Sequence, residues 1–138
     1  MPKHDAYFLK ICSAVSERAT CDRAHVGCLL VQDGHIISTG FNGSPVGQPH
    51  CDTVGHQMEN GHCIRTVHAE ANAAIQAALH GVSTRGSTCY LTHFPCYACA
   101  KMLVNAGVVK VVFDQVYGFD LRALQLLADA GIGVTCPE

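Results

Sequence analysis

The sequence predicts an α/β fold in which helices cover a mostly parallel sheet. After an opening helix and hairpin, apolar runs of strand length alternate with segments of helical periodicity. The 138 residues are 49% hydrophobic and only 14% charged. This composition suits one domain over residues 1–138 with a single core, and it excludes general disorder.

The elements follow from periodicity and from capping residues. Asp5 is the expected N-cap of the first helix, and Pro95 precedes the third. The expected helices are 5–20, 68–79, 96–105 and 121–130. The five expected strands are 26–31, 36–37, 88–92, 108–113 and 132–135, the first two forming a hairpin. Residues 40–65 lack periodicity and are rich in glycine, which predicts a long loop that is functional or held by metal.

Charge and cysteine content limit the classes of partner. The formal charge is −2, from 9 Lys+Arg and 11 Asp+Glu, whereas proteins that bind polymeric nucleic acid usually carry a basic excess. The polar start and the lack of an apolar run of about 18 residues predict neither a signal peptide nor a membrane span, so a cytoplasmic location is expected. Nine cysteines, an odd number, then indicate metal binding or burial in preference to disulfides.

Two short motifs carry the chemistry: His68-Ala69-Glu70, and Pro95-Cys96-Tyr97-Ala98-Cys99, each at an expected helix start. A Cys-x-x-Cys step in a first helical turn lets both sulfurs reach one tetrahedral ion, and the helix dipole favours their thiolate form. His68 adds a third ligand, which leaves one position open for water, as in catalytic zinc sites. Glu70 then lies beside the metal without binding it and can carry protons.

Either motif alone has other interpretations, such as a redox pair or half of a structural zinc site. Together and in this order they match the signature of zinc deaminases. The surrounding residues, 20–27, 40–47, 63–73 and 92–101, resemble those of the dCMP deaminases over nearly the whole chain. Free cytidine deaminases usually have Cys where this chain has His68, and tRNA adenosine deaminases differ within the second motif.

The resemblance implies a three-layer α/β/α cytidine deaminase fold with a five-stranded sheet, commonly assembled as a homo-oligomer, with a hexamer favoured. It implies hydrolysis of dCMP to dUMP and ammonia, which feeds dTTP synthesis, with dCTP activating and dTTP inhibiting in many members. The expected partners are thus small nucleotides. The alternatives are a deaminase of dCTP, deoxycytidine or guanine, and a non-catalytic DNA-uptake accessory protein that keeps the fold. The intact Glu70 argues against the last.

The resemblance also assigns binding residues. For the substrate, Asn42 contacts the deoxyribose, the Ala69 N–H contacts the base and Tyr117 covers the ring. Arg23 and Arg65 are both candidate cations for the substrate phosphate or for an effector. Arg65 is placed with the substrate, and Arg23 is placed with Gly43 and Gly47 at a site for a nucleotide effector with Mg²⁺. Asn42 is equally explained as a turn residue, the two arginines as solvated charges and Tyr117 as a packing residue. The family's basic residue after this tyrosine is absent here, where Gly118 follows.

The remaining cysteines and histidines divide into two groups. The long loop holds Cys51, His56, His62 and Cys63, with His50 adjacent and Cys21 a further candidate. A second, structural Zn²⁺ on Cys51, His56 and Cys63 would order the loop. The alternative is a set of exposed histidines and small buried cysteines. Cys12, Cys28, Cys89 and Cys136 lie in apolar patterns and are expected in the core.

Overall fold

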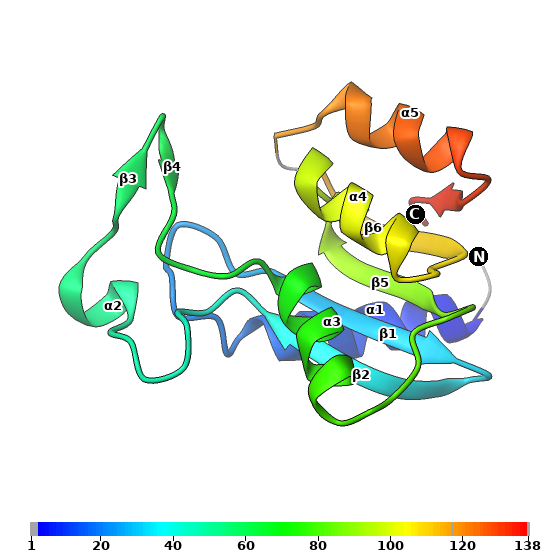
Figure 1. Ribbon diagram of the computed structural model, residues 1–138, viewed down its shortest axis with the longest axis horizontal. Coiled ribbons are helices and arrows are strands. Elements are labelled where there is room, and N and C mark those ends of the chain that lie inside the picture. Colours follow the sequence, from blue (N-terminus) through cyan, green and yellow to red (C-terminus); the bar gives the residue numbers. More distant parts are fainter. Residues whose placement is uncertain (1–2, 117, 138) are drawn as a thin grey trace.

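The computed structural model describes residues 3–116 and 118–137. Its centre is a five-stranded sheet in the order β2-β1-β5-β6-β7 (Figure 1). The strands are β1 (Gly27–Gln32), β2 (His35–Phe41), β5 (Thr88–His93), β6 (Lys110–Gln115) and β7 (Gly133–Thr135). The helices around it are α1 (Lys3–Ser16), α3 (Ala69–Leu79), α4 (Tyr97–Asn105) and α5 (Leu121–Asp129).

The sheet is mixed. β5, β6 and β7 are parallel, as the alternation of strands and helices predicts. β1 lies antiparallel to both of its neighbours, β2 and β5. The reason is that α3 carries the chain from β2 across β1 to β5, so β1, the first strand of the hairpin, sits between two strands of the opposite direction.

Helices cover both faces, which confirms the three-layer α/β/α arrangement. Side chains of β1 alternate between two clusters: Cys28 and Leu30 pack with α3, α4 and α5, whereas Leu29 and Val31 pack with α1. In Figure 1, α3 and α4 lie side by side over one face of the sheet. Their N-termini therefore meet at one end of the sheet, next to the end of β5.

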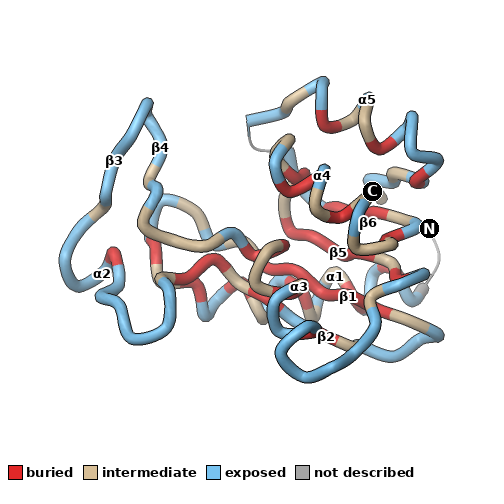
Figure 2. The backbone as a smooth tube through the Cα atoms, viewed as in Figure 1, coloured by how far each residue is buried: buried red, intermediate tan, exposed pale blue. Residues whose placement is uncertain are grey.

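A separate arm extends from this body. It contains the short helix α2 (Cys51–Val54) and a hairpin of β3 (Met58–Glu59) and β4 (His62–Cys63) (Figure 1). Figure 2 shows the arm exposed along most of its length, with Cys51 a buried exception. Isolated two-stranded hairpins are marginally stable in water, so additional contacts must hold this one.

Two expectations from the sequence are wrong. Asp5 is not an N-cap, because α1 already begins at Lys3; Asp5 is instead 1% exposed and accepts a 2.6 Å hydrogen bond from the Tyr90 hydroxyl. Cys136 is exposed, because it follows the last strand at the edge of the sheet, whereas Cys12, Cys28 and Cys89 are fully buried as expected. Within the described residues, no helix combines the length and apolarity needed to cross a membrane.

Gly40 in β2 permits a close approach of α3, and replacing it should disturb the site that α3 carries. A Cβ at this position would lie 2.2 Å from the Ala69 carbonyl oxygen and 2.4 Å from the Ala73 nitrogen, both backbone atoms that cannot give way alone. We expect Gly40→Ala to lower the free energy of unfolding by about 1–3 kcal/mol, the usual range for overpacking.

Chemical denaturation followed by circular dichroism measures this change. The control is Gly133→Ala in the edge strand β7, where the nearest atom to the added Cβ is a Lys110 side-chain carbon at 3.9 Å. Equal midpoints for Gly40→Ala and the unchanged protein would contradict the role given to this glycine.

Candidate metal centre and active site

Two helix N-termini bring three metal-binding side chains together. His68 is the N-cap of α3, and Cys96 is the N-cap of α4, where its sulfur accepts a 3.5 Å hydrogen bond from the Cys99 N–H. Pro95 directly before Cys96 fits the start of this helix. The positive ends of two helix dipoles thus face the sulfurs and favour thiolates.

The distances fit a tetrahedral metal ion. Nδ1 of His68 lies 3.5 Å from Cys96 Sγ and 3.4 Å from Cys99 Sγ. In a tetrahedral zinc site, nitrogen and sulfur ligand atoms are separated by about 3.5 Å, given bonds of about 2.0 and 2.3 Å. One histidine and two cysteines are a zinc ligand set, and three protein ligands leave a fourth position for water or substrate. These three side chains therefore suit a catalytic zinc ion.

The surroundings of this cluster favour a thiolate at Cys96. A hydrogen bond from the Cys99 thiol, with a further one from His68, lowers the pKa of Cys96 to about 4 although burial opposes the shift. The same bond and burial raise the pKa of Cys99. The contact with Cys96 raises the pKa of His68. The cluster thus favours a negative charge on sulfur, the form that binds metal.

Glu70 lies one residue inside α3 and is 5% exposed. Burial raises the pKa of its carboxyl, although His68 acts in the opposite direction. A carboxylate with a raised pKa accepts and returns a proton more readily near neutral pH, which is the property of a general acid–base.

A cavity of about 560 Å³ opens onto these residues. This volume is within the range of small-molecule sites. Its lining includes the side chains of His68, Glu70 and Cys96, and also Ala69, whose N–H is in the first helical turn and has no acceptor within the helix. The Ala69 N–H is therefore available to donate a hydrogen bond to a ligand in the cavity, as expected.

Asn42 lines the same cavity and also ties down a loop. Its Oδ1 accepts from the Val26 N–H and its Nδ2 donates to the Ala24 carbonyl, each at 2.8 Å. These two bonds use half of the amide's hydrogen-bonding capacity, because an amide can donate two bonds and accept two. Asn42 lacks the positive φ of the turn residue that the sequence also suggested, and the hydrogen bonds that tie the loop leave its amide capacity to bind a sugar.

Other residues expected in the site are placed differently. The Nε of Arg65 donates to the Gly55 carbonyl at 3.0 Å, while Arg23 is the arginine that lines the cavity. Gly43 pairs with Val67 through both backbone groups, which occupies its N–H. Gly47 is exposed with a φ of 79°. Tyr117 lies outside the described residues.

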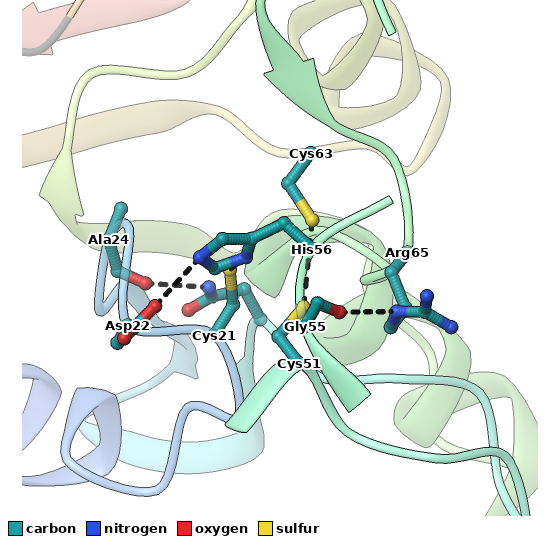
Figure 3. A network of polar contacts seen from close by, with 9 residues as sticks. Cys21, Asp22, Ala24, Cys51, Gly55, His56, Cys63 and Arg65 are labelled. Atoms are coloured by element: carbon teal, nitrogen blue, oxygen red, sulfur yellow. Dashed lines mark hydrogen bonds and ion pairs between the residues drawn. The ribbon is translucent and has the colours of Figure 1, made fainter. Parts of the chain in front are cut away.

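A second cluster joins the arm to the body. Cys21, Cys51, His56 and Cys63 place one sulfur or nitrogen each within 4.8 Å of the others (Figure 3). Cys21 Sγ is 3.3 Å from His56 Nδ1, and the Cys51 and Cys63 sulfurs are 3.5 Å apart. The opposite ring nitrogen of His56 contacts Asp22 at 2.9 Å, an arrangement typical of metal-binding histidines.

Two histidines line the cavity in roles that the sequence did not indicate. His62, named from the sequence among the candidates of the metal-binding loop, is not in the second cluster and lines the cavity next to Cys63. His93, which was not expected in the site, lines it at the end of β5. Nδ1 of His93 is 2.7 Å from the Thr92 hydroxyl, and burial lowers the pKa of its ring. The available signal was the position of His93 just before Pro95-Cys96, at the end of a strand that leads into the site.

Residues 2–115 match the cytidine and deoxycytidylate deaminase zinc-binding region. The chain belongs to this family. The match includes all three side chains of the candidate zinc centre and Glu70.

Individual members of the family agree with this assignment. A Bacillus subtilis protein named ComE operon protein 2 is 39% identical over 128 residues, which are 93% of this chain and 68% of that protein. The deoxycytidylate deaminase of Mycobacterium phage D29 is 34% identical over 83% of this chain and 96% of its own. The crystal structure of cyanophage S-TIM5 dCMP deaminase with dCMP and dUMP superposes with a TM-score of 0.87 at 31% identity, covering 99% of this chain and 98% of that one.

Proposed function

We propose that this chain is a zinc-dependent deaminase that converts dCMP and water to dUMP and ammonia. The observation that carries the proposal is the buried Glu70 beside three metal-binding side chains in a cavity of about 560 Å³. A cluster that served only to hold the fold has no use for a carboxylate at this point. The similarity to a dCMP deaminase with dCMP and dUMP bound, over 99% of this chain, supports the choice of substrate.

The reaction uses few residues. His68, Cys96 and Cys99 would hold a zinc ion, which would supply the Lewis acidity that makes water nucleophilic near neutral pH. Glu70 removes a proton from this water and passes protons to N3 of the ring and then to the leaving amine. The water oxygen bonds to C4 of the base, the C4–N bond breaks, and ammonia leaves. The Ala69 N–H donates a hydrogen bond to the base and fixes its orientation.

Ammonia release from a panel of compounds tests the proposal. We expect kcat/KM to be highest for dCMP among dCMP, dCTP, deoxycytidine and guanine. A higher value for another member of the panel would move the assignment to that substrate. Absence of release from every compound by zinc-loaded protein would favour the non-catalytic alternative.

We also propose a second zinc ion at Cys21, Cys51, His56 and Cys63. Four ligands of this kind form a closed, structural zinc site, and the ion would explain how the exposed arm stays ordered. We expect about two zinc ions per chain by elemental analysis, since each cluster holds one. Cys51→Ser should remove one of them, lower Tm and leave the other, whereas a content of one in the unchanged protein would exclude the second ion.

Regulation and assembly remain predictions. Activation by dCTP·Mg²⁺ through Gly47 and its neighbours should shift the dCMP saturation curve by about 5–150-fold, the usual range of allosteric coupling, with dTTP opposing it. Superimposable curves would exclude this regulation. The exposed Ile75 and Leu79, one turn apart on α3, support homo-oligomerisation, and the family resemblance favours a hexamer. Sedimentation analysis measures the assembly directly.

A further inference from the structure

The cavity has a cationic side chain on one wall. Arg23 is the only lysine or arginine among the described residues that line it, and His62 is also a lining residue. A nucleotide monophosphate needs a donor for its charged oxygens, and the guanidinium group suits phosphate because it presents several N–H groups in a fixed plane. Arg65, the alternative from the sequence, is directed to the Gly55 carbonyl of the arm.

The side chain of Arg23 links two irregular segments of the chain. One is its own loop between α1 and β1, and the other is the turn between β3 and β4. Its guanidinium donates to the Gly61 carbonyl of that turn at 3.4 Å. This contact is long, exposed and uses one of five donors, so it leaves capacity for an anion.

The second cluster holds both segments together. Cys21 is two residues before Arg23, and Cys63 is two residues after Gly61. Asp22, next to Arg23, contacts the ring of His56 at 2.9 Å (Figure 3). Two of the four cluster residues, Cys21 and Cys63, also line the cavity. The cluster is therefore continuous with the wall that carries Arg23.

We infer that Arg23 binds the 5′-phosphate of the substrate, and that the cluster of Cys21, Cys51, His56 and Cys63 positions it. The inference rests on the proposed function and specifies how the site distinguishes a nucleotide from a nucleoside. The phosphate is remote from the reacting C4, so its contact acts equally on the ground state and the transition state. Loss of Arg23 should therefore raise KM and leave kcat nearly unchanged.

Binding of the product dUMP and of deoxyuridine, measured by calorimetry on zinc-loaded protein, tests the role of Arg23 independently of turnover. We expect Arg23→Gln to weaken dUMP by about 10–100-fold, as for loss of a charge-assisted hydrogen bond, and to leave deoxyuridine unchanged. Arg65→Gln tests the rival assignment. Arg85→Gln, at the opposite end of β5, removes the same charge remote from the cavity.

The outcomes separate the hypotheses. An equal loss of dUMP and deoxyuridine in Arg23→Gln, or a dUMP-specific loss in Arg65→Gln, would overturn the assignment of the phosphate to Arg23. If the unchanged protein binds dUMP but releases no ammonia from dCMP, the proposed function fails while the assignment of Arg23 can still be judged from binding.

Cys51→Ser tests the positioning role, because Cys51 belongs to the cluster but not to the cavity lining. We expect it to lower zinc content by one ion, weaken dUMP selectively, and add little further loss in combination with Arg23→Gln. Asp22→Ala provides a milder change should Cys51→Ser fail to fold, since loss of such an outer carboxylate typically costs about 10–100-fold in metal affinity. Unchanged dUMP affinity after loss of the second zinc ion, or parallel loss of deoxyuridine, would refute the positioning role.

Discussion

Glu70→Gln is expected to reduce turnover of dCMP by about 10⁴-fold or more while the protein keeps its zinc and still binds nucleotide. A general acid–base is typically worth about 10²–10⁴-fold, and Glu70 serves more than one proton transfer in the proposed reaction. Glutamine preserves the shape of this side chain, which is only 5% exposed, so substrate binding should be kept. The loss of activity should therefore appear in kcat. Ammonia release, zinc content and dUMP affinity measure the three properties separately.

Glu59→Gln is the matched control, because it makes the same chemical change on the exposed strand β3. It should turn over dCMP at the unchanged rate. Near-normal turnover in Glu70→Gln would remove this residue from the mechanism. Loss of zinc in Glu70→Gln would instead show that the carboxylate holds the metal site together.

The residues of the zinc centre were predictable because each lies in a local pattern. His68 and Cys96 are helix N-caps, and Cys99 is one turn after Cys96, so sequence spacing alone determines most of their geometry. The approach of the two helices follows from the α/β alternation, which places α3 and α4 on the same face of the sheet. Local spacing and the order of the elements were together sufficient to predict these three residues as one candidate metal site.

The second cluster was only partly predictable. Cys51, His56 and Cys63 share one loop, and their spacing suggested a metal site. Cys21 comes 30 residues before Cys51, in a different loop, and no periodicity links these two segments. Their approach depends on how the arm folds back against the body, which is a tertiary contact that sequence spacing does not encode.

The arginines show the same limit more clearly. The resemblance offers Arg23 and Arg65 alike for a phosphate or an effector, whereas in the structure Arg23 lines the cavity and Arg65 contacts the arm. Both follow irregular backbone, where the direction of a side chain has no fixed period. The hairpin of β1 and β2 was expected, but the antiparallel pairing of β1 with β5 was not, because the alternation of elements describes the order of the chain and not which strands become neighbours.

Cys96→Ser is expected to abolish deamination by removing the catalytic metal. The hydroxyl of serine stays protonated near neutral pH, so it replaces a thiolate ligand poorly, and two ligands hold zinc far less tightly than three. The effect should reach background turnover, because without the metal none of the described residues that line the cavity makes water sufficiently nucleophilic. Elemental analysis should show one zinc ion fewer per chain, with the ion at Cys21, Cys51, His56 and Cys63 retained.

Cys136→Ser makes the same change at an exposed cysteine that belongs to neither cluster, and it should alter neither zinc content nor turnover. Comparing Cys96→Ser with Cys51→Ser then separates the two sites. Each should lose one ion, but only Cys96→Ser should lose kcat, since Cys51 acts on nucleotide affinity through Arg23. Undiminished zinc in Cys96→Ser would show that the metal lies elsewhere. Equal loss of kcat in both variants would mean that the second cluster supports the catalytic centre itself and not only the position of Arg23.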